Sequence, residues 1–250
     1  MPATVVLVHG AWHGAWCWSR VVDGLRERGV DARAIDLPGH GDSTEQLADL
    51  YTDAATLRAV LDSLDGPAVV CGHSYGGAVV SLGAAGHPAV RHVVFLAALM
   101  LDAGESVSRS IPDPPGGPPE PESLVGAAMR FSDDGTVVTI DRDAAPAVFF
   151  ADCDDADVEW ALSKLGPQPA ASFQQPIDAA AWRSVPSTYV VCAGDRAIPP
   201  WLQHAFAERA TETVVFPTSH SPFLSRPDLL VDLLDGLARR VGSTTGTPAA

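Results

Sequence analysis

Short runs of β-branched and other apolar residues alternate along the chain with segments whose apolar residues recur at helical spacing. The first run, Val5 to Val8, predicts a strand, and the segment from Trp16 to Arg28 has the spacing of a helix closed by Gly29. Strands that alternate with helices favour right-handed crossovers and a mostly parallel sheet covered on both faces. The same patterns predict further strands over 30–35, 67–71, 93–96, 189–192 and 213–216, and further helices over 47–64, 78–85 and 227–240.

The alternation breaks at about Asp102 and resumes only at Tyr189. A proline-rich segment, Ile111 to Glu122, predicts a loop because proline cannot continue a helix or a central strand. Between this loop and Trp182 the chain has helical and turn-like pieces with several aromatic residues, which indicates a helical cap inserted between two strands. We therefore expect a core formed by 1–101 and 186–241, a cap insertion over 102–185 and a flexible tail over 242–250.

Composition narrows the class of protein. The chain has 250 residues, 46% of them apolar and 19% charged, which is typical of one globular domain with an insertion. Its 16 basic and 31 acidic residues give a net charge of −15, so we expect neither nucleic acid nor an anionic membrane as a partner. The longest apolar run, Val93 to Leu101, is too short for a membrane span of about 20 residues. The N-terminus lacks the features of a signal peptide, so we expect a cytoplasmic location.

Neither the cysteines nor the histidines and acids suggest a metal site, and no cofactor is expected. The cysteines are scattered without a CxxC motif, so buried thiols are expected rather than disulfides or a zinc site. His9 and His13 follow a strand, without a helix to bring them onto one face. The acidic stretch from Asp152 to Asp157 lacks the glycine turn and closing glutamate of an EF-hand calcium loop, and a solvated helix start is the better interpretation.

The segment Gly72-His73-Ser74-Tyr75-Gly76 matches the pattern G-x-S-x-G and lies directly between a predicted buried strand and a predicted helix. In that position the pattern is typical of a nucleophile elbow, a sharp turn in which small glycines allow the serine hydroxyl to project above the sheet. The alternative is a purely structural role, in which the segment is a glycine-rich turn with an N-capping serine, and the strand–turn–helix context disfavours it. Ser74 is therefore the candidate nucleophile.

A serine hydroxyl needs a base beside it and a carboxylate that orients the base. Asp195 follows the predicted strand 189–192, and His220 follows the predicted strand 213–216. Both residues are expected at the carboxyl edge of the sheet, where α/β proteins gather their sites, and the chain order Ser, Asp, His is that of the α/β-hydrolases. Asp102 also follows a strand and is the main rival for the acid, ranked behind Asp195.

Acyl transfer also needs donors for the developing oxyanion. We expect the backbone N–H of Tyr75, directly after the nucleophile, and that of Ala11, in the loop after the first strand, to supply them. His9 is interpreted as a structural hydrogen-bonding residue. Packing or loop-bracing roles are expected for the other histidines near this edge, His13, His40 and His73.

These motifs resemble the α/β-hydrolase superfamily, and within it the branch of plant methylesterases, hydroxynitrile lyases and their bacterial esterase relatives. The resemblance is carried by the strings VHGAWHGAWCW (8–18), GHSYGG (72–77), VCAGDRAIP (191–199) and Ser219-His220. It covers the chain apart from the proline-rich loop and the tail. It implies an α/β-hydrolase fold, with Ser74, Asp195 and His220 as the triad and the amides of Ala11 and Tyr75 as the oxyanion hole.

Departures from the family pattern discriminate among its members. The lyases typically have threonine where this chain has Gly10, and lysine where it has Ser221, so the resemblance favours ester hydrolysis over cyanohydrin cleavage. The loop Asp36 to Ser43 resembles the general α/β-hydrolase version, and Tyr75 is larger than the aliphatic residue of the plant enzymes, which weakens transfer of a plant-hormone substrate. Haloalkane dehalogenases and epoxide hydrolases resemble the chain less, because they use an aspartate where Ser74 stands.

We therefore expect a serine carboxylesterase that acts on a small to medium apolar or aromatic ester, with that small molecule as its partner. The tryptophan-rich first loop and the aromatics of the cap suggest an apolar pocket. The candidate pocket residues are Trp12, His13, Phe131, Phe149 and Trp160. Thioester or lactone hydrolysis, C–C bond cleavage on the same triad and a ligand receptor without turnover stay as alternatives, and a homodimer is compatible with the sequence.

Overall fold

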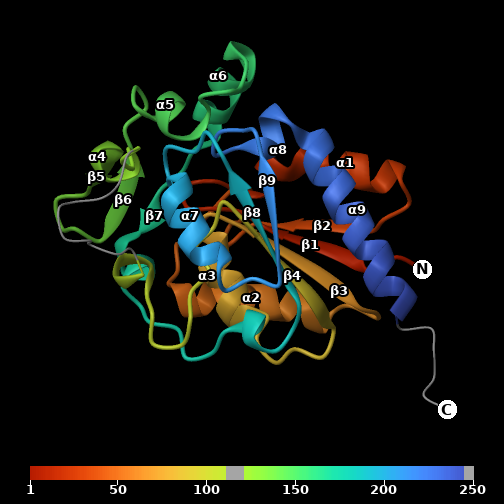
Figure 1. Cartoon of the computed structure of the whole chain (residues 1–250). Coiled ribbons are helices and arrows are strands. Elements are labelled where there is room, and N and C mark those ends of the chain that lie inside the picture. Colours follow the sequence, from red (N-terminus) through yellow and green to blue (C-terminus); the bar gives the residue numbers. More distant parts are fainter. Residues whose placement is uncertain (111–120, 245–250) are drawn as a thin grey trace.

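The computed structural model describes residues 1–110 and 121–244, and most of the predicted proline-rich loop lies outside them. Six parallel strands form the main sheet in the order β2-β1-β3-β4-β8-β9 (Figure 1), which confirms the predicted parallel architecture. The strands are β1 (Thr4–Val8), β2 (Ala32–Ile35), β3 (Ala68–His73), β4 (Val90–Leu96), β8 (Ser187–Cys192) and β9 (Glu212–Phe216).

The register of the sheet brings the carboxyl ends of its strands to one edge. Val8 at the end of β1 pairs with Gly72 of β3, and His73 pairs with Leu96 at the end of β4. Cys192 at the end of β8 pairs with Phe216 at the end of β9. The loops after β1, β3, β8 and β9 therefore begin side by side, at the edge where α/β proteins place their sites.

Helices cover both faces of this sheet. α1 (Ser19–Glu27) and α9 (Pro227–Thr244) pack together on one face, and α2 (Leu50–Asp62) and α3 (Gly76–Gly83) on the other (Figure 1). The inner strands β1, β3, β4 and β8 are almost wholly buried, as parallel strands are when both faces are covered, whereas the edge strands β2 and β9 are partly exposed. A short 3₁₀ helix, Ala15–Trp18, precedes α1, and the later helices of the core are α7 (Pro200–Ala207) and α8 (Pro222–Ser225).

Residues 97–186, here called the insertion, separate β4 from β8 and span the whole of the predicted cap, 102–185, of which 111–120 lie outside the described residues. The insertion contains helices, as predicted, and in addition a three-stranded antiparallel sheet, β5-β6-β7, that the sequence pattern did not indicate. These strands have two to four residues each, too few to show a period of two. The elements are α4 (Val125–Ala128), β5 (Met129–Phe131), β6 (Val137–Ile140), α5 (Ala145–Phe149), α6 (Asp155–Lys164) and β7 (Gln168–Pro169), with 3₁₀ helices at Val107–Arg109, Ala170–Phe173 and Ala181–Arg183.

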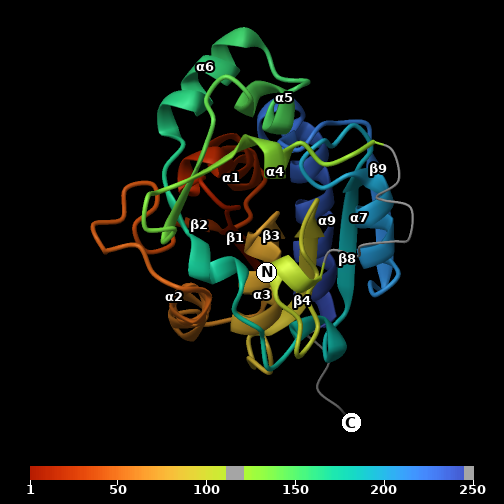
Figure 2. The ribbon, with the colours of Figure 1, turned by 90° about the vertical axis from the view of Figure 1, so that its left-hand side faces the viewer.

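The insertion covers the carboxyl edge of the main sheet. Figure 2 shows α4, α5 and α6 together at the end of the molecule opposite α2 and α3. Two hydrogen bonds join the insertion to the loop after β1: Trp12 Nε1 donates to Val138 O at 3.0 Å, and Gly166 N donates to Trp12 O at 2.8 Å. The insertion therefore covers the loops that begin at this edge.

The first residues of the predicted tail are helical. α9 continues to Thr244, and the rest of the predicted tail, 245–250, lies outside the described residues. The helix persists because Gly242 packs closely against the backbone of Met1 and Pro2, which anchors its last turn to the N-terminal segment.

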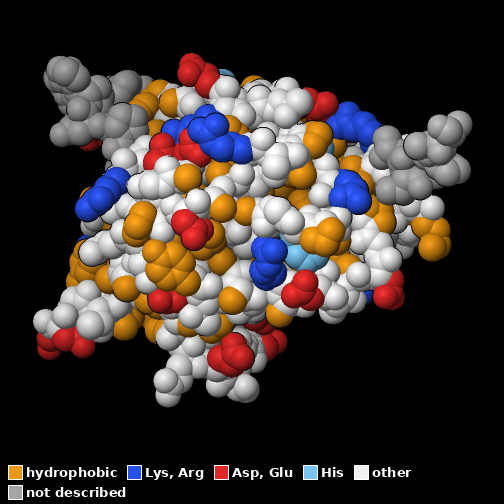
Figure 3. Space-filling model, turned by 90° about the horizontal axis from the view of Figure 1, so that it is seen from below, with side chains coloured by type: hydrophobic (Ala, Val, Ile, Leu, Met, Phe, Trp, Pro, Cys, Tyr) orange, Lys and Arg blue, Asp and Glu red, His pale blue; other side chains and the backbone are white. Residues whose placement is uncertain are grey.

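On the face seen in Figure 3, acidic and basic side chains are interspersed among apolar ones. Within the described residues, no helix is both long and apolar enough to cross a membrane.

Candidate active site

Ser74 lies in a strained turn between β3 and α3. Its φ angle of 53° is in the left-handed region that non-glycine residues rarely adopt. The turn needs glycine on both sides: a Cβ at Gly72 would collide with the Gly76 carbonyl, and a Cβ at Gly76 would lie 2.6 Å from His9 O. This is the geometry of a nucleophile elbow, in which strain in the backbone raises the serine above the sheet.

Backbone hydrogen bonds fix this turn to the end of β4. Ser74 N donates to Leu96 O at 3.2 Å, and Ser74 O accepts from Gly77 N at 3.0 Å and from Leu99 N at 3.1 Å. These contacts oppose relaxation of the strained residue toward an ordinary conformation, so the side chain of Ser74 keeps its direction.

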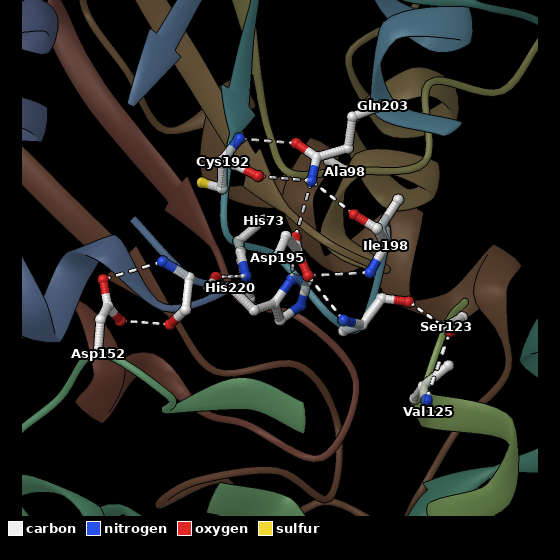
Figure 4. Close-up of polar contacts among 12 residues, drawn as sticks. His73, Ala98, Ser123, Val125, Asp152, Cys192, Asp195, Ile198, Gln203 and His220 are labelled. Atoms are coloured by element: carbon white, nitrogen blue, oxygen red, sulfur yellow. Dashed lines mark hydrogen bonds and ion pairs between the residues drawn. The ribbon is translucent and has the colours of Figure 1, made fainter. Parts of the chain in front are cut away.

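His220 and Asp195 form a buried pair at the same edge. His220 Nδ1 donates to Asp195 Oδ2 at 2.7 Å, and both side chains are 1% exposed or less (Figure 4). Because Nδ1 faces a carboxylate, it carries the proton, and Nε2 keeps the lone pair that a general base uses. The two residues come from the loops after β9 and β8, as the sequence predicts.

Asp195 is held by three further donors. Its Oδ1 accepts from Ala197 N at 2.7 Å and Ile198 N at 3.0 Å, and its Oδ2 also accepts from Gln203 Nε2 at 2.9 Å. These bonds satisfy a carboxylate that would be costly to bury alone, and they fix the oxygen that receives the His220 proton.

Gln203 of α7 is a site residue that sequence reasoning missed. This buried side chain binds Asp195, accepts from Cys192 N at 2.8 Å and donates to Ile198 O at 2.6 Å. It therefore joins the end of β8 to the loop that carries the acid (Figure 4). A lone glutamine on a short helix has no distinguishing spacing, so nothing in the pattern of this single sequence indicated it.

The Gly10–Ala11 peptide is oriented by His9. His9 Nε2 accepts from Leu37 N at 3.1 Å, so Nδ1 is the protonated nitrogen, and it donates to Gly10 O at 2.8 Å. In a trans peptide the N–H points opposite to the C=O, so the Ala11 N–H faces away from His9. A Cβ at Gly10 would lie 2.9 Å from Ser74 Cβ, which brings this peptide against the elbow.

The Ala11 and Tyr75 amides are both free to act as donors. Neither N–H donates to any acceptor within residues 1–110 and 121–244. Buried backbone donors are nearly always paired, so two free amides beside one serine point to an acceptor supplied by a ligand.

The other histidines of this edge are neutral. Burial, with nearby histidines adding to it, lowers the pKa of His9 to about 3, and burial lowers the pKa of His13 to about 4. Burial likewise lowers the pKa of His40, and it places that of His73 well below its usual range. His73 braces the site, because its Nε2 donates to His220 O at 2.9 Å.

Three of the five predicted pocket residues lie together beside His220. The Phe149 ring is 5.6 Å from the His220 ring and 5.6 Å from the His13 ring, and it is 5.8 Å from the Trp12 ring. Trp160 lies farther out, 37% exposed and edge-on to Trp16 at 5.2 Å. Phe131 is 60% exposed on β5 and makes no ring contact with this group within the described residues.

Asp102, the rival acid, is placed away from the histidine. It forms a two-pronged ion pair with Arg183, with Nε to Oδ1 at 2.6 Å, and this pairing lowers the pKa of Asp102. Of the two candidate acids, Asp195 is the one that contacts His220.

A second buried acid, Asp53, is hydrogen-bonded to the side chain of Tyr75. Its hydroxyl donates to Asp53 Oδ2 at 2.6 Å, while Asp53 Oδ1 has no partner within the described residues. Burial raises the pKa of Asp53 to about 7, against the smaller opposing effect of the Tyr75 hydrogen bond.

Comparison with known proteins identifies the family of the chain. The sequence matches the alpha/beta hydrolase family over residues 5–233, and the chain belongs to that family, which confirms the predicted fold class. Alpha/beta hydrolase nvfD of Aspergillus novofumigatus (strain IBT 16806) is 28% identical over 252 residues, covering 95% of this chain and 97% of that protein. Methylesterase 2 of Arabidopsis thaliana is 29% identical over 253 residues, covering 93% and 95%.

A solved structure shows the same fold. A pyrethroid hydrolase from Sphingobium faniae JZ-2 superposes with a TM-score of 0.83 at 24% identity, covering 96% of this chain and 99% of that chain. The predicted resemblance to the α/β-hydrolases and their methylesterase relatives is therefore confirmed.

Proposed function

We propose that the protein is a serine carboxylesterase with Ser74 as nucleophile, His220 as base and Asp195 as the acid that orients it. The observation that carries this proposal is the buried His220–Asp195 pair at the sheet edge where the strained Ser74 elbow also lies. The kinship with a methylesterase supports an ester as the substrate.

In the proposed mechanism, His220 Nε2 takes the proton of Ser74 Oγ as the oxygen attacks the ester carbonyl. The negative charge that develops on the carbonyl oxygen is bound by the amides of Ala11 and Tyr75. Asp195 stabilises the imidazolium, which then protonates the leaving alcohol. Water, deprotonated by the same histidine, hydrolyses the acyl-enzyme and restores Ser74.

The substrate we propose is a small to medium ester with an apolar or aromatic group. Trp12, His13 and Phe149 form one aromatic group in which the Phe149 ring contacts that of His220, and His13 is uncharged at neutral pH. An apolar acyl or alkoxy group would bury surface against these rings without desolvating a charge, whereas a charged group would find none of opposite sign among them.

Turnover of p-nitrophenyl acetate and of an aryl ester such as p-nitrophenyl benzoate tests the proposal. We expect release of p-nitrophenol by the wild type, and loss of it in Ser74→Ala with the circular dichroism spectrum unchanged. Ser63→Ala, at an exposed serine after α2, is the matched control and should retain full activity. Equal turnover by Ser74→Ala and the wild type would refute the assignment of the nucleophile.

A further inference from the structure

An aspartate of the insertion holds the loop that carries His220. The Asp152 carboxylate accepts hydrogen bonds from Ser219 N at 2.9 Å, from Ser219 Oγ and from Ser225 Oγ at 3.0 Å. Ser219 directly precedes His220, and Ser225 is the last residue of α8, which follows it. One carboxylate thus joins the two ends of the segment that contains the histidine, and Figure 4 shows it on the opposite side of His220 from Gln203.

The same part of the insertion also contacts the imidazole. Phe149, three residues before Asp152, is buried, and its ring lies 5.6 Å from that of His220. A tight turn, in which Cys153 N donates to Phe150 O at 3.0 Å, links the two residues. Movement of this turn would therefore change both the packing on the ring and the hydrogen bonds to its loop.

A second tie joins the insertion to α8. Arg20 of α1 forms a two-pronged ion pair with Asp157 of α6, at 2.6 and 2.5 Å, and also donates to Leu224 O at 2.9 Å. β9, which leads into the histidine loop, is an edge strand of the main sheet, so the sheet supports it on one side only. The insertion supplies support that the sheet does not.

The acidic stretch 152–157 therefore has two roles. Asp154 caps α6 by accepting from Asp157 N at 2.8 Å, which fits the predicted helix start. We propose that Asp152 is a positioning residue for His220, so that the triad is complete only while the insertion is seated on the sheet edge. This inference rests on the proposed function, and it couples entry of substrate beneath the insertion to the reactivity of the histidine.

The strength of the effect follows from the demands of proton transfer. His220 Nε2 must lie within hydrogen-bond reach of Ser74 Oγ, and a misplacement of about 1 Å can cost up to ~10²-fold in rate. Loss of the three hydrogen bonds that join the two ends of this segment permits a shift of that size. We expect Asp152→Ala to lower kcat/KM for p-nitrophenyl acetate by about 10- to 100-fold, mainly through kcat.

Asp154→Ala is the matched control, because it removes a carboxylate two residues away whose hydrogen bond, within the described residues, is to its own helix. It should retain wild-type kcat/KM. Asp152→Asn keeps one acceptor oxygen for Ser219 N and should recover part of the rate lost in Asp152→Ala. Wild-type kcat/KM in a folded Asp152→Ala, even with a lowered Tm, would overturn the inference, because a merely structural contact changes stability without changing kcat.

Proton NMR tests the inference without substrate. The Nδ1 proton of His220, bonded to Asp195, should give a downfield resonance in the wild type and in Asp154→Ala, and it should broaden or shift in Asp152→Asn and Asp152→Ala. If Asp152→Ala does not fold, Asp152→Asn decides the matter by the same resonance. An unchanged resonance in folded Asp152 variants would overturn the positioning role, whereas absent turnover in the wild type would count against the esterase proposal alone.

Discussion

Replacement of Asp53 by Asn should make the protein more stable at pH 8 and leave it nearly unchanged at pH 4. Asp53 is fully buried, its Oδ1 has no partner within the described residues, and burial raises its pKa from 3.8 to about 7. At a pH between these two pKa values, Asp53 keeps its proton in the folded state and releases it in the unfolded state. The folding stability of the wild type therefore falls as pH rises from about 4 to about 7, and it is level above that.

The pKa difference sets the size of the effect. A carboxyl whose pKa rises from 3.8 to about 7 on folding costs about 4 kcal/mol once it is ionised in both states. Asn cannot ionise, and its side-chain oxygen can still accept the Tyr75 hydroxyl. The variant should therefore gain up to about 4 kcal/mol over the wild type at pH 8, or very roughly 10 °C in Tm.

Urea unfolding of the wild type and Asp53→Asn at pH 4, 6 and 8 measures this difference. Glu45→Gln, at an exposed loop residue, removes the same charge from a chain of net charge −15 and controls for general charge repulsion. The reasoning would be refuted by a stability difference between wild type and Asp53→Asn that stays constant from pH 4 to pH 8.

Three further substitutions test the construction of the site. Gly10→Ala places a Cβ 2.9 Å from both Ser74 Cβ and His73 Nδ1, so the Gly10–Ala11 peptide must shift. We expect kcat/KM to fall by about 10²-fold, as for loss of one oxyanion donor. An unchanged rate would show that this peptide is not at the reacting centre. Gln203→Leu removes one of the hydrogen bonds to Asp195 together with those to Cys192 N and Ile198 O, and it should lower the free energy of unfolding by about 3 kcal/mol, measured in urea; a loss under about 1 kcal/mol would contradict this network. His9→Phe removes the donor to Gly10 O, so it should lower kcat more than it raises KM; a change in KM alone would argue against a role in the oxyanion peptide.

The core of the fold and the His–Asp pair could be predicted from the sequence because local rules determine them. Most strands of the main sheet contain a β-branched run and are followed by a helix, and a parallel sheet necessarily brings the carboxyl ends of its strands to one edge. The sequence therefore predicts Asp195 and His220 at one edge, and in the structure a hydrogen bond of 2.7 Å joins them. The roles of Ser74, Ala11 and Tyr75 stay predictions, as do the cytoplasmic location and the oligomeric state.

The insertion could not be predicted in the same detail, because its structure depends on contacts distant in sequence. β7 is the pair Gln168–Pro169, which becomes a strand only by pairing with β6. In sequence Asp152 is indistinguishable from its acidic neighbours, because its partners Ser219 and Ser225 lie about 70 residues away. Phe131 and Phe149 looked equivalent as aromatics of the insertion, yet one is exposed and the other contacts the His220 ring.

The central claim is that His220 and Asp195 activate Ser74, and the most direct test is the site and rate of labelling by a fluorophosphonate. Intact mass and peptide mapping should show one adduct, on Ser74, formed rapidly by the wild type. Labelling should be slowed by about three orders of magnitude or more in His220→Ala and Asp195→Asn. A label on another residue, or equal rates in wild type and His220→Ala, would contradict the account.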